Sequence, residues 1–110
     1  MQPASSSLEH HLNVPEEALQ RVCRRWQITE LSVFGSVLRD DFRTDSDVDV
    51  LVSFAPETRW SLLDLVRIKR EFETLFGREV DLITRSSVEK SPNWIRREAI
   101  LSTAQPIYTV

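Results

Sequence analysis

The segment 47–54, Asp-Val-Asp-Val-Leu-Val-Ser-Phe, most limits what this chain of 110 residues can fold into. Its β-branched residues, its alternation and the Pro56 that follows it predict a strand. Because side chains alternate faces along a strand, Asp47, Asp49 and Leu51 share one face and the valines share the other. The valines suit a buried core, so two carboxylates are left close together on the opposite face.

Two carboxylates at this spacing repel each other, and their burial is costly unless another group compensates them. Mg²⁺ would compensate them, because it is usually held by one or two carboxylates together with substrate phosphates. A calcium-binding EF-hand loop begins with the same spacing from Asp45. That loop needs glycine and glutamate where this chain has Val50 and Pro56, so it is excluded. The remaining alternative is an exposed edge strand whose carboxylates are hydrated.

Gly35 and Ser36 lie upstream, where a short predicted strand at 30–35 gives way to a predicted helical turn. Glycine lets a phosphate approach the backbone, and N–H groups at a helix start can hold a phosphate oxygen together with the serine hydroxyl. Ten residues separate Ser36 from Asp47, which is enough for a short helix and a turn that bring the next strand back. An ordinary turn with a capping serine is the alternative.

A third carboxylate, Asp81, lies in the middle of the next predicted strand, 78–84. If that strand pairs beside 47–54, Asp81 either completes a two-metal cluster or acts as a base toward an attacking hydroxyl. The alternative is an exposed strand face. Lys69 and Arg70 are candidates for phosphate binding by charge alone, and we expect both on a solvated helix face.

Predicted helices at 15–26, 60–76 and 94–104 alternate with these strands, and a short last strand is expected at the C-terminus. Apolar positions at helical spacing predict which helix faces are buried. The stripe of the long helix comprises Leu62, Leu65, Ile68, Phe72, Leu75 and Phe76. Core packing is expected for Cys23, Trp60, Trp94 and Ile107, and for the last three a protein interface is the alternative.

The length suits one domain, with residues 1–13 as a flexible lead-in and 14–110 as an α+β domain. We expect a small mixed β-sheet of three to four strands flanked by helices. A net charge of −3 argues against a chain that mainly coats nucleic acid, so no direct nucleic-acid binding is expected. We also expect no membrane segment and no export signal, and therefore a cytoplasmic setting.

The gapped motif resembles the signature of the DNA polymerase β-like nucleotidyltransferase superfamily. Gly35 and Ser36 are followed by ten residues that include Arg39, and then by Asp47 and Asp49. The short chain resembles the minimal nucleotidyltransferases of that superfamily, the MNT proteins. Many of these are antitoxins paired with a HEPN-domain ribonuclease toxin.

The resemblance implies a polymerase β-like fold and a role for each matching residue. The implied nucleotide-binding residues are Gly35, Ser36 and Arg39, and the implied catalytic metal ligands are Asp47, Asp49 and Asp81. Asp81 is matched by strand position more than by motif. Arg39 either contacts phosphate or pairs with a nearby aspartate. The implied cofactor is Mg²⁺, as two ions, and the implied substrate is ATP.

The implied reaction is the transfer of AMP from ATP to a hydroxyl, with a tyrosine of a partner HEPN toxin as the acceptor. The chain would then be the antitoxin of a type VII-like toxin–antitoxin pair and part of a hetero-oligomer. One alternative is a non-catalytic antitoxin that neutralises the toxin by binding. Another is a nucleotidyltransferase that acts on a small molecule or an RNA end, although 110 residues leave little room for an added acceptor domain.

Overall fold

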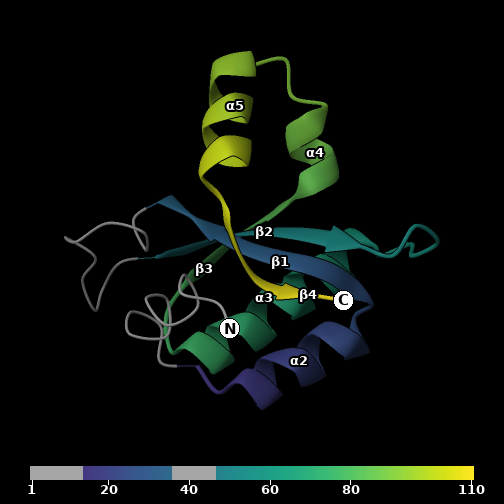
Figure 1. Ribbon diagram of the computed structural model, residues 1–110. Coiled ribbons are helices and arrows are strands. Elements are labelled where there is room, and N and C mark those ends of the chain that lie inside the picture. Colours follow the sequence, from purple (N-terminus) through teal and green to yellow (C-terminus); the bar gives the residue numbers. More distant parts are fainter. Residues whose placement is uncertain (1–13, 36–46) are drawn as a thin grey trace.

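A computed structural model describes residues 14–35 and 47–110, which form a four-stranded sheet with helices on both faces (Figure 1). The strands are β1 (Ile28–Phe34), β2 (Val48–Phe54), β3 (Val80–Thr84) and β4 (Gln105–Thr109). The helices are α2 (Glu16–Arg25), α3 (Leu62–Phe76), α4 (Arg85–Glu89) and α5 (Trp94–Thr103). The expected α+β architecture is confirmed. The expected lead-in and the expected helical turn after Gly35 lie outside the described residues.

The sheet is mixed, with the spatial order β3-β2-β1-β4. β1 pairs antiparallel with β2 on one side and with β4 on the other, whereas β2 and β3 are parallel. Parallel neighbours need a crossover connection, and α3 supplies it. β4 forms an edge, where Pro106 is tolerated because one side of an edge strand needs no ladder donors.

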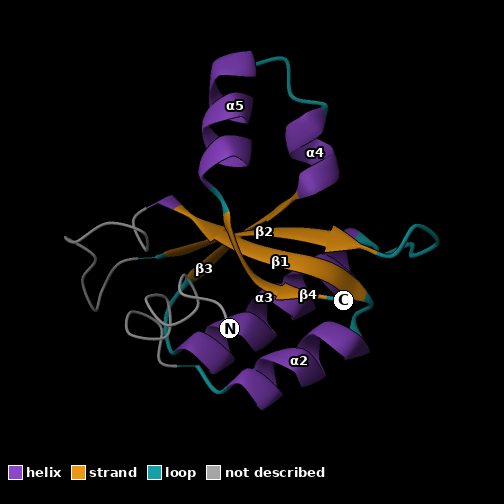
Figure 2. Ribbon diagram, viewed as in Figure 1, coloured by secondary structure: helices purple, strands orange, loops and turns teal. Residues whose placement is uncertain are grey.

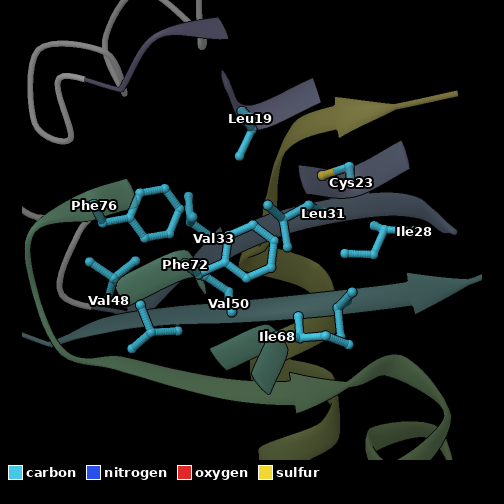
Figure 3. Packing of buried hydrophobic residues seen from close by; sticks show 12 residues of the cluster. Leu19, Cys23, Ile28, Leu31, Val33, Val48, Val50, Ile68, Phe72 and Phe76 are labelled. Atoms are coloured by element: carbon cyan, nitrogen blue, oxygen red, sulfur yellow. The ribbon is translucent and has the colours of Figure 1, made fainter. Parts of the chain in front are cut away.

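The larger core cluster lies between the sheet and the helix pair α2 and α3. Val48, Val50 and Val52 of β2 are completely buried there, which confirms the predicted valine face. Phe72 of α3 packs over the same face (Figure 3). Cys23 of α2 is also buried in this cluster, as expected, and burial raises the pKa of its thiol to about 12. Cys23 is therefore a packing residue with an unreactive thiol.

The other face of the sheet is covered by α4 and α5, as Figure 2 shows. A smaller cluster forms there from Phe34, Leu51, Val88 and Ile100. Both faces of β2 are therefore covered along part of its length. The face that carries Asp49 is not the open side of a two-layer sheet.

A capping box decides where α3 begins, and a glycine decides where it ends. Ser61 accepts a hydrogen bond from the Asp64 backbone N–H at 3.2 Å, and the Asp64 carboxylate accepts one from the Ser61 N–H at 3.0 Å. This capping box starts the helix at Leu62, two residues after the predicted start. Gly77 ends it with a left-handed φ of 69°. Trp60 instead donates from Nε1 to the Trp26 carbonyl at 3.0 Å.

Three sequence expectations need correction or addition. Leu62 is 79% exposed although it is in phase with the buried stripe, which reaches the core only from Leu65 onward. Trp94 is 62% exposed, so core packing was the wrong expectation there, whereas Trp60 and Ile107 do pack against the core. α4 was not predicted. Its five residues are too few for a periodic pattern, and its start is set by the Thr84 side chain, which accepts from Ser87 N–H.

None of the helices in residues 14–35 and 47–110 is long and apolar enough to cross a membrane.

Candidate active site

Three aspartates gather at one end of the sheet, two of them on one face. Asp49 of β2 is opposite Phe34 of β1 in the antiparallel ladder and opposite Asp81 of β3 in the parallel one. Residues opposite each other in neighbouring strands point to the same face, which α4 and α5 cover further along. Asp47 precedes Asp49 by two residues, where the Val48 N–H already bonds the Glu79 carbonyl at 2.9 Å. Asp49 and Asp81 are therefore neighbours on one face. Asp47 lies directly before β2, which starts one residue later than predicted, and its charge acts on Asp49. The roles of the three residues stay predictions.

The charges of Asp47 and Asp81 act on the carboxylate of Asp49. Burial raises the pKa of Asp49, and the neighbouring charges of Asp81 and Asp47 raise it further. Asp49 is half-buried, whereas Asp47 and Asp81 are exposed. The positive charge of Arg96 on α5 has the opposite effect and lowers the pKa of Asp49. The row is thus a concentration of negative charge that would attract cations.

Gly35 lies next to the aspartates at the end of β1. It follows the last residue of β1 and has a φ of 76°, a conformation that favours glycine. A Cβ at this position would overlap a carboxylate oxygen of Asp49, so the Gly35 backbone and the Asp49 side chain are in direct contact. The sequence predicted Gly35 beside the aspartates, and this contact means that a larger residue would displace the Asp49 carboxylate.

Two further predicted site residues, Ser36 and Arg39, lie outside the described residues, and their roles stay predictions. Lys69 and Arg70 are on α3, which packs against the opposite face of the sheet from the carboxylates. Lys69 pairs there with Glu73 at 4.0 Å. These two cations therefore do not belong to the carboxylate site.

The carboxylate row does not form a ready metal centre. Within the part of the chain that the structure describes, no three histidine, cysteine, aspartate or glutamate side chains are placed to hold one ion together. The donor chemistry nevertheless suits Mg²⁺, which prefers carboxylate oxygens and commonly completes its shell with water and substrate phosphates. The charges of Asp47 and Asp81 make the charged form of Asp49 less favourable, and a bound divalent cation would offset this repulsion.

Arg96 is the site residue that the sequence did not single out. It lies in α5, 47 positions after Asp49, in a segment whose charges match an ordinary solvated helix. No motif or spacing connects Arg96 to the aspartates. Only the return of α5 over the sheet brings its charge within reach of Asp49.

The sequence and the fold were compared with known proteins. Residues 15–105 match the family model described as "Nucleotidyltransferase domain". A predicted protein adenylyltransferase of Methanocaldococcus jannaschii is 44% identical over 61 residues, or 56% of this chain. Protein adenylyltransferase MntA of Thermococcus cleftensis is 42% identical over 65 residues, or 59% of this chain. The chain spans 63% and 64% of the lengths of these two relatives.

Solved structures agree with this match. A predicted minimal nucleotidyltransferase shares 37% identity and superposes with a TM-score of 0.64 over 84% of this chain and 88% of that one. The MNT antitoxin complex with tri-AMPylated HEPN toxin from Shewanella oneidensis shares the fold, with a TM-score of 0.57 at 12% identity. That alignment covers 86% of this chain and 70% of that chain. The expected polymerase β-like fold is confirmed, and the chain belongs to the nucleotidyltransferase domain family.

Proposed function

We propose that this chain transfers AMP from ATP to a protein hydroxyl. The observation that carries the proposal is the row formed by Asp49 and Asp81, with Asp47 directly before β2 and the Gly35 backbone against Asp49. Such a row has no evident structural purpose, because the neighbouring carboxylates make the charged form of Asp49 less favourable. Two relatives at 42% and 44% identity that are named as protein adenylyltransferases support the choice of reaction.

Asp47, Asp49 and Asp81 would hold Mg²⁺, as two ions, together with the phosphates of ATP. When bound, Mg²⁺ neutralises phosphate charge and lowers the pKa of the attacking hydroxyl. Gly35 would let the triphosphate approach the backbone at the end of β1. A side chain at this position would instead collide with the Asp49 carboxylate. In this proposal Ser36 and Arg39 contribute further phosphate contacts.

The proposed transfer is a single displacement at phosphorus. The acceptor oxygen forms a bond to the α-phosphorus of ATP, and the bond from that phosphorus to the bridging oxygen breaks. Pyrophosphate leaves with the electron pair of the broken bond. The hydroxyl proton passes to the exposed carboxylate of Asp81 and then to water.

The proposed acceptor is a tyrosine of a HEPN-domain toxin, and the chain is then the antitoxin of a hetero-oligomeric pair. This part is supported by the likeness to the MNT antitoxin in complex with the AMPylated HEPN toxin of S. oneidensis. Silencing would follow from placing the negatively charged AMP group on the toxin. A chain that only covers the toxin would need none of the three aspartates.

The test is AMP transfer from labelled ATP with Mg²⁺ to a co-purified HEPN partner, followed by mapping of the labelled residue. We expect label on a tyrosine, and a loss of roughly 100-fold or more in Asp49→Asn, because the carboxylate is removed without a change of shape. Glu57→Gln, an equal charge change at an exposed site, is the control. Absence of label with the unchanged protein would overturn the proposal. Neutralisation of the toxin by an inactive Asp47→Asn/Asp49→Asn variant would instead favour an antitoxin that acts by binding.

A further inference from the structure

A hollow of about 250 Å³ lies on the side of the sheet covered by α4 and α5. Ile83 of β3 contributes to its wall, and Ile83 shares a strand face with Asp81 two residues earlier. Arg96 and Arg97 of α5 also line the hollow. The hollow and the carboxylate row are therefore neighbours on one face of β3.

The arginines on this side of the sheet differ in what they contact. Arg97 donates from Nη1 to the Ser91 carbonyl at 2.7 Å, which connects α5 to the segment after α4. Arg85 of α4 forms an ion pair with Glu30 at 3.3 Å and is also engaged in the fold. The guanidinium of Arg96 makes no ion pair or hydrogen bond with any residue of 14–35 or 47–110. Within this part of the chain, Arg96 is thus not engaged in the fold as Arg85 and Arg97 are.

Arg96 lies on the side of the sheet that carries the aspartates. It lines the hollow together with Ile83, which shares a face of β3 with Asp81. No carboxylate of residues 14–35 or 47–110 lies within 4.0 Å of its guanidinium to hold it in an ion pair. An exposed arginine side chain has the freedom to move toward an anion that binds at the row.

A nucleoside triphosphate at this site would bring its phosphates close to three carboxylates. A divalent ion bound there would be shared between the carboxylates and the phosphates, and a cationic side chain would offset part of the remaining negative charge. A guanidinium fits this need better than an ammonium, because its fork of N–H groups binds two phosphate oxygens at once.

Arg96 lines a hollow next to the carboxylate row and has no ion-pair partner among residues 14–35 and 47–110. From this placement we infer that Arg96 binds the β- and γ-phosphates of the nucleotide, which leave as pyrophosphate. This assignment rests on the proposed nucleotidyl transfer. The nucleotide phosphates would lie between the carboxylate row and the mouth of the hollow. Arg96 is then a substrate-binding residue contributed by the second helix layer.

The experiment measures the affinities of the full chain for MgATP, magnesium pyrophosphate and AMP by calorimetry. We expect Arg96→Gln to weaken MgATP and pyrophosphate binding by roughly tenfold or more, the usual effect of losing a charged hydrogen-bonding partner. AMP affinity should change less than about twofold, because AMP lacks the β- and γ-phosphates. Arg96→Lys should recover part of the loss as a point charge.

Arg67→Gln is the matched control, because Arg67 is an exposed helical arginine on α3, on the other side of the sheet. It should leave all three affinities unchanged. Unchanged MgATP affinity in Arg96→Gln, with AMP transfer by the wild type intact, would overturn the assignment and leave the proposed function standing. An equal loss for AMP and ATP would also overturn it, since that pattern indicates a nucleoside contact or a damaged fold. A wild-type chain that binds no nucleotide would overturn both proposals.

Discussion

Replacing Gly35 with alanine tests the contact between the end of β1 and Asp49, and Gly77 offers a matched control within the same chain. Both glycines have left-handed φ angles, 76° and 69°. An alanine at either position therefore carries a similar conformational cost, about 1–2 kcal/mol. The two sites differ in what the added methyl group meets. Nothing lies within 4 Å of a Cβ at Gly77, whereas a Cβ at Gly35 overlaps the Asp49 carboxylate.

The overlap should affect activity far more than stability. The added Cβ overlaps only a terminal carboxylate oxygen of Asp49, whose Cγ and Cβ lie 3.3 and 3.7 Å away. A half-buried carboxylate can rotate away at little cost, so the free energies of unfolding of Gly35→Ala and Gly77→Ala should agree within about 0.5 kcal/mol. Rotation displaces Asp49 from the row. A displacement of about 1 Å in a reacting site costs about 100-fold in rate.

Urea unfolding of both variants gives the stability comparison, and AMP transfer from labelled ATP to the HEPN partner gives the activity comparison. We expect Gly77→Ala to transfer AMP at nearly the wild-type rate and Gly35→Ala to be about 100 times slower. Equal rates in the two variants would refute the reasoning, because the contact with Asp49 would then be irrelevant to the site. A much larger loss of stability in Gly35→Ala would show that Asp49 cannot move.

Two further predictions concern stability. Folding raises the pKa of Asp49, so its charged form destabilises the folded state. In metal-free buffer, Asp49→Asn should therefore be more stable than wild type at pH 7. The gain in stability should disappear near pH 3, below the usual pKa of 3.8, because the wild-type carboxyl group is then protonated in both the folded and the unfolded state. Urea unfolding at the two pH values measures the difference in free energy of unfolding between Asp49→Asn and wild type. The same difference at both pH values would contradict the electrostatic explanation. Phe72→Ala should lower the free energy of unfolding by about 3–5 kcal/mol, because Phe72 is fully buried. Leu62→Ala should change it by less than about 0.5 kcal/mol, and a larger loss would mean that this exposed side chain packs against something.

The parts of the fold that could be predicted are those whose cause is local. Alternation in β2 predicted which face of the strand is buried, because one face carries only valines. Gly77 predicted the end of α3, because a left-handed residue ends a helix. The start of α3 was predicted two residues early. Trp60 fits the apolar pattern, but the capping box at Ser61 decides the boundary.

The parts that could not be predicted depend on which element covers which. Periodicity places Leu62 on the buried stripe, but a stripe is buried only where a neighbour covers it. Trp94 is exposed for a similar reason, since no described residue buries the start of α5. Arg96 belongs to the same class. Its nearness to Asp49 depends on the path of the chain through α4 and back along α5, which no local pattern encodes.

The position of Asp81 depends both on a local pattern and on the packing of the core. In β3, Val80 and Leu82 pack on the α3 side, whereas Asp81 and Ile83 share the other face. Val80 lies opposite Val48, and this pairing sets Asp81 opposite Asp49. A slip of one residue would move Asp81 into the apolar layer and Val80 out of it, which burial on both sides opposes. The apolar pattern that stabilises β3 therefore also holds the third carboxylate beside the other two.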